Sequence, residues 1–233
     1  MRLPAQFLPD PLPADPLPLA VEWLALARQR RDQPNPNAMV IATVDSNGQP
    51  SARVVLCKDL APVLGSITFF TNYDSHKGRE LAANPRVAIV MHWDHLHRQL
   101  RIEGRARRVP APDSDAYFRT RPWQRRIGAW ASAQSSPVDS RATLEKNLAA
   151  TAARFGTPVP GPEDAPDTGN IGAGVPRPAN WGGFEVIAAA VELWVEGESR
   201  IHDRARWTRD VSFDPTPGSP VQVGPWQCSR LQP

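Results

Sequence analysis

Cysteine and long apolar runs are scarce in this sequence. Cys57 and Cys228 are the two cysteines among 233 residues, and they lie too far apart for a metal-ligand or dithiol spacing. A disulfide framework is therefore excluded, which is typical of the reducing cytoplasm. Proline and aspartate interrupt the opening residues, MRLPAQFLPDPLPADP, too often for a signal peptide. No run approaches the roughly 20 apolar residues of a membrane span. We therefore expect a cytoplasmic protein with no membrane partner.

Motifs of several common enzyme classes are also absent. The chain has no GxGxxG after its first β-rich run and no GxxxxGK[ST], so the dinucleotide-binding and P-loop signatures are missing. No metal-ligand cluster, nucleophile–base pair or pair of catalytic carboxylates stands out, and we expect no metal. The net charge of +3 is small for a nucleic-acid-binding protein. Nucleic acid is therefore a remote alternative as a partner.

Proline, in contrast, is abundant. The sequence has 26 prolines, about twice the usual share, and they gather near the N-terminus, in 158–178 and in 215–225. We predict that residues 1–14 form an extended arm and that 15–233 form a single domain. Within that domain, about 157–180 has no core-forming pattern and is predicted to be a mobile surface loop.

The remaining segments predict a mainly β protein. Two β-rich runs flank Asn47-Gly48, a strong hairpin signal, and further strands are expected in SITFFTN, RVAIVMHW, RQLRIEGRARRV, GGFEVIAAAVELWVEG and SRIHDRARWTRD. Helices are expected from Asp15-Pro16 to the arginines at 28–31, from Ser75 to before Pro85, in APDSDAYFRTRP, and in SRATLEKNLAATAARF. The last of these has an apolar stripe, which consists of Leu144, Leu148, Ala152 and Phe155. Six or seven strands with hairpin connections indicate an antiparallel barrel with peripheral helices, an α+β fold class.

The segment GESRIHDRARW carries an unusual row of basic residues. If it is one strand, Arg200, His202, Arg204 and Arg206 lie on the same face. Three arginines would lower the pKa of His202 by repulsion unless an anion is bound. The row therefore predicts an anionic partner.

Three further clusters have groups that bind anions. Thr71, Ser75, His76 and Lys77 surround the start of a helix, where backbone N–H groups, hydroxyls and a lysine would form a phosphate cradle. Tyr117 and Arg121 are four residues apart and would share a helix face, although the same spacing fits a solvated basic face. Arg53 and Lys58 lie at either end of an apolar strand core. Both positions are equally consistent with charged side chains that face solvent. Trp130 and the polar run after it add stacking and hydrogen-bonding groups; that run is Gln134, Ser135 and Ser136.

In order and wording, these clusters resemble the pyridoxamine 5′-phosphate oxidase family. The matching pieces include LPADPLPLAVEWL, FFTNYDSHKGREL, YFRTRP, IGAWASAQSS, WGGFEV and ELWVEGESRIHDR. The resemblance covers most of the chain from about Leu12 onward and implies an FMN-binding split β-barrel. It also implies a homodimer with active sites at the subunit interface. The implied reaction oxidises pyridoxine 5′-phosphate or pyridoxamine 5′-phosphate to pyridoxal 5′-phosphate, with O2 as the acceptor and H2O2 as a product.

The resemblance also implies roles for individual residues. The FMN site would consist of Arg53, Val54, Val55, Leu56, Cys57, Lys58, Phe70, Thr71, Ser75, His76, Lys77, Gln99, Gln134, Ser135, Trp194 and Arg204. The substrate would be bound by Lys58, Tyr117, Arg121, Arg125, Arg200, Ile201 and His202. Of these, Arg200 and His202 would face the reacting carbon as catalytic residues. Arg206 has no assigned partner and is expected to be a solvated charge.

The sequence departs from the family pattern at several positions. The N-terminal Arg-x-x-Tyr element that covers bound substrate is missing, because the first residues contain no tyrosine. Arg125 stands where a small serine is common at the phosphate site, and His76 replaces a usual arginine beside Lys77. Cys57 replaces a common apolar residue.

Two alternatives therefore remain. One is a sister flavin oxidase of the same fold, such as a phenazine-biosynthesis oxidase. The other is a non-catalytic protein that binds FMN or pyridoxal phosphate.

Overall fold

The computed structural model describes residues 7–161, 171–172 and 174–233. By packing, the chain divides into two compact units. The first comprises Met1–Phe69, Glu80–Arg107 and Phe184–Pro233, and the second comprises Phe70–Arg79 and Arg108–Gly183. The expectation of an arm followed by one domain stays a prediction.

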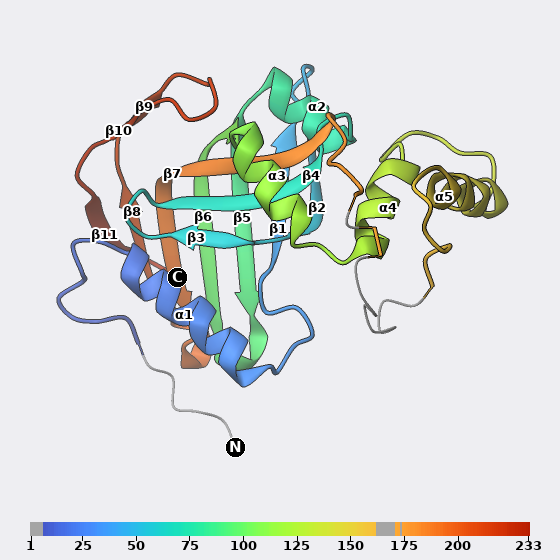
Figure 1. Cartoon of the computed structure of the whole chain (residues 1–233). Coiled ribbons are helices and arrows are strands. Elements are labelled where there is room, and N and C mark those ends of the chain that lie inside the picture. The colour runs from blue at the N-terminus through green and yellow to red at the C-terminus, as the bar shows by residue number, and fades with distance from the viewer. Residues whose placement is uncertain (1–6, 162–170, 173) are drawn as a thin grey trace. The chain divides into compact units, whose positions relative to one another are not determined.

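An antiparallel sheet dominates the first unit (Figure 1). Its strands follow the order β11-β8-β7-β6-β5-β1-β2, while β4 pairs with β3 and β7. Their bounds are β1 Ala38–Val44, β2 Pro50–Leu56, β3 Asp59–Ala61, β4 Ser66–Asn72, β5 Arg86–Trp93, β6 Arg98–Arg108, β7 Trp181–Val195, β8 Asp203–Thr208 and β11 Gln227–Leu231. A separate two-stranded sheet pairs β9, Val211–Phe213, with β10, Val221–Val223. The predicted antiparallel, mainly β class is confirmed.

The hairpin between β1 and β2 forms where Asn47-Gly48 predicted it. Gly48 has a φ of +85°, a conformation that side chains disfavour. The Asp45 carboxylate accepts hydrogen bonds from the backbone N–H groups of Asn47 and Gln49, at 2.8 and 2.9 Å. This turn sets the register in which Val40 lies opposite Val54.

The core of the first unit lies on one face of the sheet. Alternate residues of β1, β5 and β6 are buried, as their alternating apolar pattern requires. Helix α1, Leu17–Arg30, buries Leu17, Ala20, Trp23, Leu24 and Ala27. The Asp15 carboxylate accepts a hydrogen bond from the backbone N–H of Leu17 at 2.9 Å, so the predicted helix start is confirmed.

The other face of β1 and β2 is apolar but uncovered. Val40 is 41% exposed and its cross-strand partner Val54 is 65% exposed. This apolar sheet face is therefore a candidate contact surface for another protein.

The second unit contains most of the helices. They are α3 Ala111–Arg119, α4 Trp123–Ala131 and α5 Arg141–Arg154, together with the start of α2, His76–Ala83. Helices α4 and α5 lie side by side (Figure 1) around a cluster that includes Trp123, Ile127 and Ala152. Helix α4 was not predicted from the sequence. The expected stripe of α5 is wrong at Leu144, which is 42% exposed.

The proline-rich segment 157–180 contributes to this cluster. Val175 is buried among the α4 and α5 side chains, and Ile171 packs against them. The Trp130 indole N–H donates a hydrogen bond to the Pro176 carbonyl at 2.7 Å. The expectation that the segment lacks core residues is therefore wrong. The prediction that the segment is mobile concerns mainly residues 162–170 and 173, which lie outside the described residues.

The basic row at the end of β7 is not one strand. Residues Glu198–Arg200 form a short 3-10 turn, and β8 begins at Asp203. Gly197 allows this turn, because a Cβ there would lie 1.8 Å from the Ile201 carbonyl oxygen. Arg200 and His202 therefore precede the strand, and the predicted face of four basic residues is wrong.

Among the residues that the structure describes, no helix combines the length and apolar character needed to cross a membrane.

Candidate functional site

The second unit gathers the predicted phosphate cradle. The Lys77 ammonium donates a hydrogen bond to the Gln134 side-chain oxygen at 3.1 Å, and the Thr71 hydroxyl donates to the same oxygen at 3.0 Å. Lys77 also reaches the Ser75 hydroxyl at 3.3 Å. Ser75 accepts from the Gly78 N–H at 3.3 Å, at the start of α2. The fold thus unites an ammonium, two hydroxyls and a helix start in one donor set, which suits a phosphate.

Two other predicted members of this set lie beside it in the sequence. His76 and Ser135 are both exposed. Ser135 has a φ of +69°, so the chain turns sharply just after Gln134.

Tyr117 and Arg121 are brought together by an aromatic stack in the second unit. Helix α3 ends at Arg119, so the predicted shared helix face is wrong. Instead, the Arg121 guanidinium lies over the Trp181 ring, 4.6 Å from its centroid. Tyr117 stacks on Phe70 at 3.9 Å, and Phe70 stacks on Trp181 at 5.4 Å. A phenol and a guanidinium therefore share one aromatic support.

Sequence reasoning missed Trp181 as the organiser of this pair. It follows Tyr117 by 64 positions, so no local spacing reveals the contact. The available signal was its place in WGGFEV, at the start of β7.

Arg125, the other residue predicted at the phosphate site, lies exposed in the first turn of α4.

The first unit gathers a second group of predicted residues on β7 and β8. Trp194 and Arg204 are cross-strand partners. The ring of His202 lies 4.7 Å from the Trp194 ring. Gln99 lies on β6 with its side chain half-buried, whereas Arg200 and Ile201 are exposed. Aromatic rings and a guanidinium on neighbouring strands are groups that would contact a planar ligand.

A buried carboxylate holds Arg204. Glu192 accepts hydrogen bonds from the Arg204 Nε and Nη2 atoms, at 3.1 and 2.9 Å, and from Arg101 at 3.1 Å. Arg206 forms a two-point ion pair with Glu103, at 3.0 and 2.8 Å, and this contact raises the pKa of Arg206. The expectation that Arg206 is a solvated charge without a partner is therefore wrong.

Arg53 is also held by an acid. Its Nη2 atom lies 3.0 Å from the Glu80 carboxylate, which accepts further hydrogen bonds from Thr43 at 2.6 Å and Ser51 at 2.7 Å. Glu80 is buried. Its position in the short helix α2 gave no sign of this contact.

The run from Arg53 to Lys58 alternates between sheet faces. Val54 and Leu56 point away from the side that carries Arg53 and Val55. Cys57 is fully buried, and burial raises the pKa of its thiol to about 11. A ligand that contacts the whole run would therefore meet it largely through the backbone.

Two family models match the chain. The one described as pyridoxamine 5′-phosphate oxidase matches residues 27–155, and the one described as the pyridoxine 5′-phosphate oxidase C-terminal dimerisation region matches residues 181–233. The chain belongs to the pyridoxamine 5′-phosphate oxidase family.

Curated relatives support this membership over most of the chain. A pyridoxine/pyridoxamine 5′-phosphate oxidase of Gluconobacter oxydans (strain 621H) is 44% identical over 223 residues, which cover 95% of this chain and 96% of the relative. One of Burkholderia lata is 44% identical over 200 residues, which cover 86% of this chain and 81% of the relative.

Solved structures of the family have the same fold. PhzG from Burkholderia lata 383, in complex with tetrahydrophenazine-1-carboxylic acid, matches with a TM-score of 0.77 and 26% identity, over 96% of this chain and 95% of that one. A pyridoxamine 5′-phosphate oxidase-related, FMN-binding protein from Nostoc punctiforme matches with a TM-score of 0.65 and 15% identity, over 95% of this chain and 100% of that one. The predicted antiparallel split-barrel fold is confirmed.

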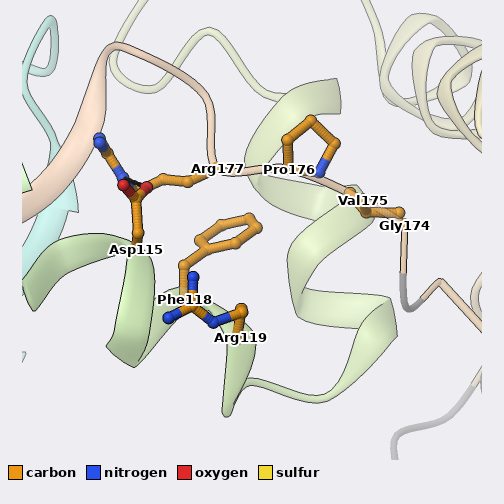
Figure 2. Close-up of a pocket in the computed structure, with 7 residues that line it drawn as sticks. All are labelled: Asp115, Phe118, Arg119, Gly174, Val175, Pro176 and Arg177. Atoms are coloured by element: carbon orange, nitrogen blue, oxygen red, sulfur yellow. Dashed lines mark hydrogen bonds and ion pairs between the residues drawn. The ribbon is translucent and has the colours of Figure 1, made fainter. Parts of the chain in front are cut away.

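One cavity in this family member borders the aromatic stack, because its lining residue Phe118 packs edge-on against Trp181 at 5.0 Å and lies 5.4 Å below the Arg121 guanidinium. It has a volume of about 270 Å³ and is lined by Asp115, Phe118, Arg119, Gly174, Val175, Pro176 and Arg177. Figure 2 shows the Asp115–Arg177 ion pair, 2.6 Å long, on one side of the Phe118 ring. That pair neutralises two charges of the lining, and Arg119 supplies a further positive charge.

No group of three or more His, Cys, Asp or Glu side chains with a metal-binding arrangement occurs within 7–161, 171–172 and 174–233.

Proposed function

We propose that this chain is an FMN-dependent oxidase that converts pyridoxine 5′-phosphate and pyridoxamine 5′-phosphate to pyridoxal 5′-phosphate, with O2 as the acceptor. Membership of the family and the names of its relatives support the activity. The observation that carries the proposal is that the second unit holds two separate groups of side chains whose chemistry suits an anion. One is the Lys77–Gln134 cradle, and the other is the Tyr117–Arg121 pair. A flavin phosphate and a substrate phosphate together require two such groups.

The donor set of the cradle fits the phosphate of FMN. Lys77 supplies a positive charge, and Thr71, Ser75 and Gln134 supply hydrogen-bonding groups around it. The other proposed FMN contacts are Phe70, His76 and Ser135 in this unit, and Arg53 to Lys58, Gln99, Trp194 and Arg204 in the first. When bound, FMN supplies the hydride acceptor and passes the electrons to O2.

The substrate phosphate is assigned to Lys58, Tyr117, Arg121 and Arg125. The planar guanidinium of Arg121 and the phenol of Tyr117 are suited to phosphate oxygens. Their shared stack on Phe70 and Trp181 restricts both side chains before substrate arrives. This rigidity lowers the entropy cost of binding.

The reacting end of the substrate is assigned to Arg200, Ile201 and His202. All three lie in the turn before β8, where Arg200 and Ile201 are exposed and His202 is half-buried. The Gly197 N–H donates a hydrogen bond to the Nδ1 atom of His202 at 3.2 Å. This contact leaves the other ring nitrogen to face a ligand.

In the reaction, the C4′ alcohol loses two electrons and two protons, and O2 becomes H2O2. The amine substrate also takes up one water and releases ammonia.

A phenazine-biosynthesis oxidase is the second candidate. The similarity to PhzG favours it. However, tetrahydrophenazine-1-carboxylic acid has no phosphate, whereas the Tyr117–Arg121 pair matches one.

We also propose a homodimer with active sites at the subunit interface. The match to the C-terminal dimerisation region supports it. The exposed Val40–Val54 pair supplies an apolar surface that a second copy would cover.

Arg200→Ala tests the division of the site. It is expected to reduce turnover of pyridoxine 5′-phosphate far more than it weakens FMN binding, because Arg200 is assigned to substrate. The measurements are pyridoxal phosphate formation and a flavin fluorescence titration. Flavin binding with no turnover of either B6 phosphate by the unaltered protein would refute the proposed function. Turnover of a reduced phenazine carboxylate instead would favour the second candidate.

A further inference from the structure

Glu192 is an acidic residue inside an otherwise apolar strand. It lies on β7 between Val191 and Leu193, which are fully buried, and is itself 2% exposed. A buried carboxylate is costly unless its charge is paired and its oxygens accept hydrogen bonds. Here both oxygens are used. Oε1 accepts from Arg204, and Oε2 accepts from Arg101.

The contact to Arg204 has a defined geometry. Two nitrogens of one guanidinium edge, Nε and Nη2, bind a single carboxylate oxygen, so Arg204 is held at two points. The Gln232 carbonyl accepts from Nη1 at 3.1 Å. Among the described residues, these bonds use three of the five N–H donors of an arginine, and two are left for a ligand.

The residues around Arg204 indicate the kind of ligand that its guanidinium would contact. Its cross-strand partner is Trp194, and the Trp194 ring contacts the ring of His202. Glu192 and Trp194 are two residues apart on β7, so their side chains lie on the same sheet face. A fixed guanidinium is thereby placed next to an aromatic surface.

Charge balance alone does not account for Glu192. The cluster contains three arginines, at 101, 204 and 206, and two glutamates, at 103 and 192. Glu103 neutralises Arg206 through a two-point ion pair, but no described contact joins it to Arg204. Glu103 also lies 4.0 Å from Arg101, and Glu192 lies 4.0 Å from Arg206. The two acids therefore contribute the same charge to the same cluster, but the described contacts of Arg204 are with Glu192.

We infer that Glu192 is a positioning residue that fixes the Arg204 guanidinium for contact with the flavin. The inference rests on the proposed function, because Arg204 is assigned to FMN there. The carboxylate acts through Arg204 and does not itself touch the ligand. Arg101 and the Gln232 carbonyl help to hold the same arrangement.

The test compares Glu192→Gln with Glu103→Gln, which remove the same charge from the same cluster. FMN affinity is measured by fluorescence titration, and the flavin reduction potential by anaerobic dye equilibration. Glu192→Gln is expected to weaken FMN binding about tenfold or more, since it removes hydrogen bonds between charged groups. Its potential is expected to become more negative, because a displaced Arg204 no longer stabilises the reduced flavin. Glu103→Gln is expected to leave the affinity within about threefold.

A pure charge effect predicts the opposite sign. If Arg204 stays in place, loss of the negative charge of Glu192 makes the potential more positive. Such a shift, with unchanged FMN affinity, would overturn the inference. Equal weakening of FMN binding by the two glutamine variants would also overturn it.

Arg204→Lys keeps the test available if Glu192→Gln does not fold. It retains the charge that compensates Glu192 but lacks the Nε–Nη2 edge. It is expected to reproduce the loss of FMN affinity, and unchanged affinity would overturn the inference.

If the unaltered protein bound no FMN, both the proposed function and this inference would fail. With normal FMN binding, failure of the variants to differ refutes only the inference.

Discussion

Lys77 and Gln134 lie 57 positions apart in the sequence, and the lysine ammonium donates a hydrogen bond to the glutamine oxygen at 3.1 Å. Thr71 donates to the same oxygen. Neither Lys77 nor Gln134 alone indicates a binding site, since a lysine at a helix start and an exposed glutamine in a turn are both common. Their convergence supports the proposal that the segment Thr71 to Lys77 binds the FMN phosphate.

Lys77→Gln is expected to lower FMN affinity by about 10- to 100-fold, because it removes a charged hydrogen-bond donor from the phosphate. Riboflavin, which has no phosphate, is expected to bind both proteins equally well. Fluorescence titration with each flavin measures the effect. Lys146→Gln, at an exposed position on α5, makes the same change of charge and serves as the control. Equal loss of FMN and riboflavin binding would show that Lys77 acts on folding.

Arg53→Ala is expected to destabilise the protein as well as to weaken FMN binding. It leaves the buried Glu80 carboxylate without its arginine, which costs about 3 kcal/mol. Arg30→Ala breaks a more exposed ion pair with Asp32 and is expected to cost less than about 1 kcal/mol. Urea unfolding compares the two. Equal stabilities would contradict a structural role of the Arg53–Glu80 pair.

Val54→Asp is expected to convert a dimer into monomers without unfolding them. A charge on this surface would have to be buried in the proposed interface, whereas in the single chain Val54 is 65% exposed. Val63→Asp is the control, because Val63 is 96% exposed in a turn between strands. Sedimentation velocity distinguishes the species. An unchanged dimer in the Val54 variant would exclude this face from the interface.

Alkaline pH is expected to destabilise the protein through Cys57. Burial raises the pKa of the folded thiol from 9.0 to about 11. Between these values the unfolded thiol ionises while the folded one stays neutral, so the free energy of unfolding falls as pH rises through this window. Cys57→Ala is expected to remove that part of the fall. At pH 8, Ellman's reagent is expected to react quickly with the exposed Cys228 and slowly with Cys57. Equal rates would contradict the burial of Cys57.

Features that depend on neighbouring residues were predictable from the sequence. The Asn47-Gly48 turn, the start of α1 at Asp15 and the alternating strand β6 form as their local chemistry requires. The hairpin-connected strands also predicted the antiparallel, mainly β class, and resemblance to the family added the split-barrel topology.

Features that depend on distant contacts were not predictable. The pairing of Tyr117 with Arg121 requires Trp181, and the burial of Val175 requires α4 and α5. The close approach of the chain at Gly197 breaks the expected strand before Asp203. The acids that hold Arg53 and Arg204 were also missed, although Glu192 interrupts an apolar run and so gave a usable signal.

The central claim is that the chain oxidises a phosphorylated B6 vitamer. The most direct test supplies FMN-loaded protein with pyridoxine 5′-phosphate in air and measures pyridoxal 5′-phosphate and H2O2 together. We predict the two products in equal amounts, and much slower turnover of unphosphorylated pyridoxine. Flavin-loaded protein that yields neither product from pyridoxine 5′-phosphate or pyridoxamine 5′-phosphate would contradict the claim.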